Sequence, residues 1–198
     1  MLRRLHANTA GAFFICIYIH MGRGLYLGSY SNIKAWLVGV VIIVVAIGTA
    51  FFGYVLVWGQ ISYWAATVIT NLLTAISYVG ETLAYWFWGD YSVSNATLNR
   101  FFSFHFVCPL IIAAFTAVHL AFIHQKGSRN PTGLNSYSLK VPFHQYLTVK
   151  DAVALFAYLA FIGSLVIFFP ALLGDPENYN QADALVTPVH IKPEFYFL

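Results

Sequence analysis

The sequence has few charged residues, only two cysteines and little net charge. Charged side chains make up 9% of its 198 residues, whereas a soluble domain carries about 25%, so an ordinary soluble protein is excluded. The net charge of +3 is too small and too dispersed for a nucleic-acid-binding surface. Cys16 and Cys108 both lie in apolar runs, which excludes a disulfide framework and favours two small buried hydrophobic side chains.

Apolar residues make up 60% of the chain and gather into four segments that suit a hydrocarbon core, which a helix of about 20 residues crosses. The second segment, WLVGVVIIVVAIGTAFFGYVLVW, contains no charge at all. We therefore predict an all-α integral membrane four-helix bundle over residues 1–173, followed by an outer loop over 174–198. The predicted spans are residues 5–27, 36–58, 97–124 and 152–173.

Lysine and arginine concentrate in two of the connections, which gives the spans a direction. The loop between the third and fourth spans holds four basic residues against a single acid, and the loop between the first and second spans is also basic. Basic loops favour the inner face of a membrane, so the first and third spans run the same way. The long connection over 59–96 is apolar enough to form amphipathic helices along the interface.

Four histidines form two pairs of identical spacing. His6 and His20 lie 14 residues apart on the first span, and so do His105 and His119 on the third. That separation places both members of a pair on one helix face, about 21 Å apart along the axis. Because these spans are parallel, we expect His6 to face His105 near the outer surface and His20 to face His119 near the inner surface.

Facing imidazoles at two depths favour two haems over a bare metal site. A zinc or copper site takes three or four clustered ligands, whereas two trans imidazoles complete a haem that carries electrons. The haems would be non-covalent, since the chain has no C-x-x-C-H motif. The alternative is that each histidine is a hydrogen-bond donor between helices, and the repeated spacing argues against it.

Small and basic residues near these histidines fit the same interpretation. Gly39 and Gly53 on the second span are also 14 residues apart, and a glycine lets the face of a porphyrin approach the backbone. Arg3 and Arg23 lie three residues from His6 and His20, where they suit haem propionates. Helix packing would explain the glycines equally well, and membrane orientation would explain the arginines.

The chain resembles the cytochrome b family, the haem-bearing core of the ubiquinol–cytochrome c reductase complex, over almost its whole length. The matching stretches are HANTAGAFFICIYIHMGRGLYLGSY, GYVLVWGQISYWAATVITNL, TLNRFFSFHFVCPL, GSRNPTG, LLGDPENY and HIKPEFYF. The resemblance implies that His6 and His105 ligate a low-potential haem, and that His20 and His119 ligate a high-potential haem.

The resemblance also implies two quinone sites. At the inner, quinone-reducing site it places His124, Ser128, Lys150 and Asp151, where histidine and a lysine–aspartate pair suit proton delivery. At the outer, quinol-oxidising site it assigns Glu194 of the PEFY segment as proton acceptor. The wall of that outer pocket is expected to comprise Tyr54, Ala65, Ile69 and Tyr196.

The implied function is that of an electron-transfer subunit, an oxidoreductase inactive alone, which couples electron transfer to proton translocation. Its expected partners are ubiquinone, an iron–sulfur protein, a cytochrome c-type subunit and membrane lipid, in a homodimeric complex that binds no nucleic acid. A phenylalanine, tyrosine and isoleucine bias favours the mitochondrial inner membrane, with a bacterial plasma membrane as the alternative.

Two other functions are possible interpretations of this sequence, and its extent differs from that of the family. The chain could be a di-haem cytochrome of another membrane dehydrogenase, although PEFY would then lack an explanation. It could also be a haem-free transporter bundle, in which case the 14-residue spacing would be coincidence. The family begins with a further helix before Arg3 and continues after Leu198, so we expect this sequence to be a fragment.

Overall fold

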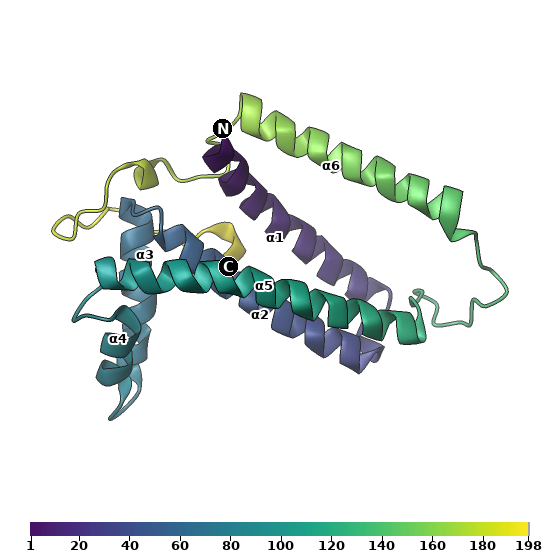
Figure 1. Cartoon of the computed structure of the whole chain (residues 1–198), viewed down its shortest axis with the longest axis horizontal. Helices are drawn as coiled ribbons and strands as arrows, with labels where there is room; N and C mark the ends of the chain where they lie inside the picture. The colour runs from purple at the N-terminus through teal and green to yellow at the C-terminus, as the bar shows by residue number, and fades with distance from the viewer. Residues whose placement is uncertain (198) are drawn as a thin grey trace. The chain divides into compact units, whose positions relative to one another are not determined.

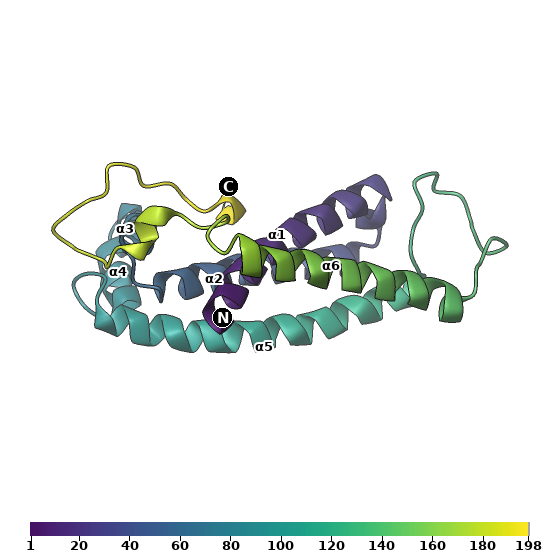
Figure 2. The same cartoon turned by 90° about the horizontal axis from the view of Figure 1, so that it is seen from above.

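The computed structural model describes residues 1–197, and every regular element in that range is helical (Figures 1 and 2). This confirms the predicted all-α fold. The chain divides into two compact units, residues 1–36 with 122–173 and residues 37–121 with 174–198. The α-helices are α1 (Leu2–Tyr26), α2 (Ile33–Val55), α3 (Gln60–Asn71), α4 (Gly80–Trp88), α5 (Asn95–Lys126) and α6 (Thr148–Phe168).

Within residues 1–197, three helical segments are long and apolar enough to cross a membrane. They are α2, α5 and residues 143–168, which contain α6, and they correspond to three of the four predicted spans. The first predicted span, 5–27, coincides with α1, but His6, Asn8 and His20 make α1 more polar than the other three. Its place in the membrane stays a prediction.

Two helix ends differ from the predicted boundaries for local reasons. α2 ends at Val55 rather than at residue 58, because Trp58 has a left-handed φ of 56° that a helix does not accommodate. α6 covers Thr148–Phe168 instead of 152–173. It stops there because Phe169 precedes Pro170, and proline disfavours the helical conformation of the residue before it.

The first unit is built on the contact between α1 and α6. Its apolar core consists of Ala12 together with Ile162, Leu165 and Val166. The buried side chain of Asn8 completes the contact, because its Nδ2 donates to Pro170 O over 3.1 Å. That carbonyl lies just beyond the end of α6, where helical carbonyls lack partners within the helix.

The second unit packs α2 against α5 and closes one end with α3 and α4. Its core includes Val55, Tyr63, Ala66, Trp88 and Phe101, of which Phe101 is fully buried. Two short 3₁₀ helices, Pro176–Tyr179 and Phe195–Phe197, belong to the same unit. α3 and α4 lie within 59–96, where interfacial helices are predicted, and their place at a membrane interface stays a prediction.

A buried hydrogen-bond chain joins α3, α4 and α5. Trp88 Nε1 donates to Thr70 Oγ1 over 2.6 Å, and Thr97 Oγ1 donates to Trp88 O over 2.9 Å. Thr97 Oγ1 also accepts from Ser94 N over 3.0 Å. The first turn of α5 is therefore fixed to the end of α4 by one hydroxyl.

We expect Thr97→Val to lower the free energy of unfolding by about 1–3 kcal/mol, because valine leaves Ser94 N and Trp88 O without their buried partner. Thermal denaturation of the membrane protein in detergent measures this. The matched control is Thr116→Val on the same helix, where the exposed hydroxyl bonds only within α5. Equal stability of the two variants would contradict the expectation.

Candidate functional site

One face of α5 carries both of its predicted haem ligands. The more buried positions of this helix recur at steps of four and three residues, which is the period of a single helix face. His105 and His119 belong to this stripe, and Figures 1 and 2 show α2 alongside it. The stripe consists of Phe101, His105, Cys108, Ile112, Phe115 and His119.

His105 is oriented by the backbone of α2. Its Nδ1 lies 2.8 Å from Thr49 O, and since a carbonyl oxygen only accepts, this nitrogen carries the proton and donates. With the proton on Nδ1, Nε2 carries the lone pair of the ring, the tautomer found in many metal-binding histidines whose other nitrogen donates a hydrogen bond. A Cβ on Gly53 would overlap the His105 ring, coming within 2.6 Å of Nδ1. A side chain at position 53 is therefore incompatible with this ring position.

His119 has an equivalent relation to Gly39. A Cβ on Gly39 would lie 3.3 Å from His119 Cε1, which is closer than ordinary side-chain contacts. The two predicted glycines thus face the two histidines of α5 in antiparallel order, Gly53 with His105 and Gly39 with His119. Sequence spacing suggested a matched pair of glycines, and the structure shows that each one lies against an imidazole.

These features fit haem. Each imidazole of α5 lies against a position of α2 without a side chain, and with the proton on Nδ1 the Nε2 of His105 carries the lone pair that would ligate iron. The other predicted ligands, His6 and His20, lie on α1 in the first unit, as do Arg3 and Arg23, which are exposed. Their pairing with His105 and His119 stays a prediction.

Two residues of the predicted outer pocket, Tyr54 and Tyr196, lie near Glu194 within the second unit. Tyr54, near the end of α2, approaches Glu194, and its buried hydroxyl lies close to the carboxylate without reaching hydrogen-bonding geometry. Tyr196 is 8% exposed and lies close enough to Glu194 for the two groups to interact electrostatically. The remaining wall residues, Ala65 and Ile69, lie one turn apart on one face of α3.

Burial raises the pKa of the Glu194 carboxyl above its usual value. The nearby Tyr54 hydroxyl partly opposes this change, whereas the negative charge of Asp175 adds to it. Burial, and then the charge of Glu194, raise the pKa of Tyr196 in turn. Glu194 therefore holds a proton more readily than an exposed glutamate does, which suits a group that accepts one.

The predicted inner-site residues are not joined to one another. His124 lies in the last turn of α5 and Asp151 in the first turn of α6, while the Lys150 ammonium lies 5.5 Å from the centre of the Tyr146 ring. Ser128 is exposed in the following loop. In the described part of the chain, no hydrogen bond or ion pair links His124 to Lys150 or Asp151.

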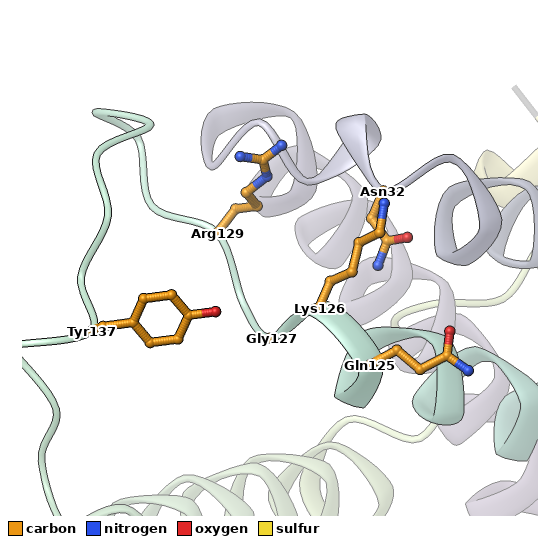
Figure 3. A pocket seen from close by; sticks show the side chains of 6 residues that line it. All are labelled: Asn32, Gln125, Lys126, Gly127, Arg129 and Tyr137. Carbon is orange, nitrogen blue, oxygen red and sulfur yellow. The ribbon is translucent and has the colours of Figure 1, made fainter.

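A basic pocket of about 390 Å³ occurs beside this region. Figure 3 shows the side chains of Lys126 and Asn32 near each other and the phenol of Tyr137 directed inward from the opposite wall. The pocket borders Ser128 in sequence but does not include it. Its lining residues are Asn32, Gln125, Lys126, Gly127, Arg129 and Tyr137.

Three functional features were missed at the sequence level. The Thr49 carbonyl that orients His105 is a backbone group, so no residue type reveals it. The approach of Asp175 to Glu194 joins positions 19 residues apart in a loop with no periodic pattern. Gln60 contacts residues 183–186. The only sequence signal for these contacts is the stretch GYVLVWGQ, which contains the glutamine but does not indicate what it binds.

Comparison with known proteins agrees with these observations. The family Cytochrome b/b6/petB matches residues 1–127. The solved structure described as "Hyperthermophilic respiratory Complex III" is similar, with a TM-score of 0.87 and 35% sequence identity, over 99% of this chain and 54% of that one. The chain thus spans about half the length of the structure it matches. With its helical membrane segments and paired glycine–histidine contacts, it belongs to the cytochrome b family.

Proposed function

We propose that this chain is the di-haem electron-transfer subunit of a membrane quinol–cytochrome c oxidoreductase. The observation that carries the proposal is the pairing of His105 with Gly53 and of His119 with Gly39 within one unit. The similarity to a structure described as respiratory Complex III supports it. Two non-covalent b-type haems would connect an outer quinol-oxidising site to an inner quinone-reducing site.

The haem ligands would be His6 and His105 at the low-potential site, and His20 and His119 at the high-potential site. When bound, haem would supply reversible one-electron chemistry. The chain's contribution is orientation: Thr49 O fixes the tautomer of His105, and Gly53 and Gly39 let the two imidazoles lie against the backbone of α2. Arg3 and Arg23 would neutralise the haem propionates.

At the outer site, Glu194 would accept a proton from the quinol hydroxyl as the quinol is oxidised. Its raised pKa makes the carboxylate a better proton acceptor than that of an exposed glutamate. Tyr54 and Tyr196 would shape the pocket beside it, with Ala65 and Ile69 on α3 forming the opposite wall. The electrons would pass to an iron–sulfur protein and to the low-potential haem.

At the inner site, His124 and the pair Lys150–Asp151 would deliver protons to the reduced quinone, with Ser128 as a further polar contact. Proton uptake on one face and release on the other couples electron transfer to proton translocation. The full complex would also contain a cytochrome c-type subunit and would be homodimeric. We place it in the mitochondrial inner membrane, with a bacterial plasma membrane as the alternative.

Glu194→Gln tests the outer site. We expect the rate of quinol oxidation to fall about 100-fold, the lower end of the range of about 10²–10⁴-fold for loss of a general base. In the unchanged protein the rate should rise with pH through the raised pKa of Glu194, because only the ionised carboxylate accepts a proton. The groups facing this carboxylate are Tyr54, Tyr196 and Asp175. Quinol oxidation in native membranes, followed across pH, is the measurement.

Thermal stability separates this effect from unfolding. Because folding raises the pKa of Glu194, its ionisation lowers stability as the pH rises through that raised value. Glutamine cannot ionise, so Glu194→Gln should be as stable as the unchanged protein, or more stable, at pH 7. A variant with normal oxidation rate and an unaltered pH profile would refute the role of Glu194.

A further inference from the structure

Gln60, the first residue of α3, binds the segment 174–198 with both ends of its side-chain amide. Its Nε2 donates to Val186 O over 2.9 Å, and its Oε1 accepts from Asp183 N over 2.9 Å. The residue is 6% exposed, so its amide is largely withdrawn from water. A buried amide whose donor and acceptor both contact one segment restricts that segment strongly, since breaking either bond leaves a polar group without a partner.

The backbone near Gln60 extends this attachment. Gly59 pairs with Gln181 in an antiparallel bridge, and a Cβ on Gly59 would overlap Asn178 O, so the two chains approach as closely as only glycine permits. Trp64 Nε1 adds a bond of 3.2 Å to Asp183 O. The remaining bonds are Gln60 N to Asn180 O (3.0 Å), Ala182 N to Trp58 O (3.0 Å) and Ser62 N to Asn178 Oδ1 (2.9 Å).

The same segment carries Glu194 back to α2. Asp175 at the start of the segment acts by its charge on Glu194 near the end of the segment. The chain between these two residues therefore folds back. Gln60 holds the middle of this folded-back chain at residues 183–186. It also lies in the corner between α2, which supplies Tyr54, and α3, which supplies Ala65 and Ile69.

We propose that Gln60 is a positioning residue for the outer quinol-oxidising site. By fixing residues 183–186 to the start of α3, it shortens the free length of chain before Glu194 and holds that carboxylate beside Tyr54. It touches neither quinol nor haem. This inference rests on the proposed function, in which Glu194 accepts the proton of the quinol.

Gln60→Leu removes both amide bonds while keeping a similar volume. In native membranes we expect kcat for quinol oxidation to fall about tenfold or more, because misplacing a reacting group by about 1 Å costs up to roughly 100-fold. The limb of the pH profile that belongs to Glu194 should shift, since its burial changes, while the number of haems per chain stays the same. The matched control is Thr67→Val, whose hydroxyl bonds only to Tyr63 O within α3.

Gln60→Glu provides a test that does not depend on the stability of the leucine variant. A protonated carboxyl reproduces both amide bonds, since it donates to Val186 O and accepts from Asp183 N, whereas an ionised one cannot donate. Burial and the acidic Asp183 on the facing segment favour the protonated form. The rate of this variant, divided by that of the unchanged protein at the same pH, should therefore rise as the pH falls.

The outcomes separate the inference from the proposed function. A normal kcat and pH profile for Gln60→Leu, with Glu194→Gln impaired, would overturn the positioning role alone. If Gln60→Leu fails to accumulate with haem, the Gln60→Glu variant decides. A rate relative to the unchanged protein that does not vary with pH would then overturn the positioning role. A Glu194→Gln variant with normal quinol oxidation would overturn both.

Discussion

Replacing His119 with alanine is expected to remove one of two b-type haems from each chain. The iron of a bis-histidine haem keeps its ligation only while both imidazoles are present. No neighbour of His119 one turn away on α5 can replace that ligand, since these are Phe115, Thr116, Phe122 and Ile123. The absorbance change on reduction should fall by about half, leaving the spectrum of the low-potential haem. Haem counted against protein in purified membranes is the measurement.

The matched control for this experiment is His144→Asn. His144 is an exposed histidine just before the first residue of α6 and belongs to neither predicted haem pair, so its loss should leave the haem content unchanged. Two haems per chain in His119→Ala would contradict the assignment of this residue and favour a helix-packing role for the imidazole. Equal loss of haem in both variants would show a general sensitivity of the fold rather than ligation.

Alanine substitutions of the α2 glycines are expected to have effects in the order Gly53, Gly39, Gly48. A methyl at position 53 would overlap the His105 ring, so either the ring leaves its bond to Thr49 O or the helices separate. Overpacking of this kind costs about 1–3 kcal/mol. Each 1.4 kcal/mol or so of that cost weakens haem binding roughly tenfold. At position 39 the methyl meets the His119 ring at 3.3 Å, and a small shift of the ring accommodates it.

Gly48→Ala is the internal control of this series. A methyl there would lie 3.8 Å from Phe52 Cε2, an ordinary contact, and alanine favours a helix over glycine by about 1 kcal/mol. We therefore expect unchanged haem content and equal or greater thermal stability. Haem affinity is measured by competition with an excess of a haem-binding protein. Equal affinities for all three variants would show that the glycines serve only helix packing.

Much of the site was predictable because helix periodicity links sequence to geometry. Identical 14-residue spacings placed His105 with His119, and Gly39 with Gly53, on single faces of their helices, and the structure shows these two faces in contact. The three most apolar spans were recognisable for a similar reason, since a hydrocarbon core demands long uncharged segments. The first span was harder to establish, because the predicted haem ligands of α1, His6 and His20, also make this helix polar.

The outer pocket was less predictable from the residues alone. The PEFY segment named Glu194 through a family resemblance, but its approach to Tyr54 depends on an irregular loop held by Gln60 and Asn178. Such loops are specified by individual hydrogen bonds between distant residues, and these leave no periodic trace in a sequence. The helix ends at Val55 and Phe168 likewise depended on local backbone conformation at Trp58 and Phe169.

The most direct test of the central claim is a redox titration of the reduced-minus-oxidised haem spectrum, with haem counted per chain, in membranes that contain the protein. We expect two non-covalent b-type haems for each chain and two separate one-electron steps, one for the site at His105 and one for the site at His119. A single haem, or none, in membranes where the chain is folded would contradict the proposal that each glycine–histidine pair on α2 and α5 forms a haem site.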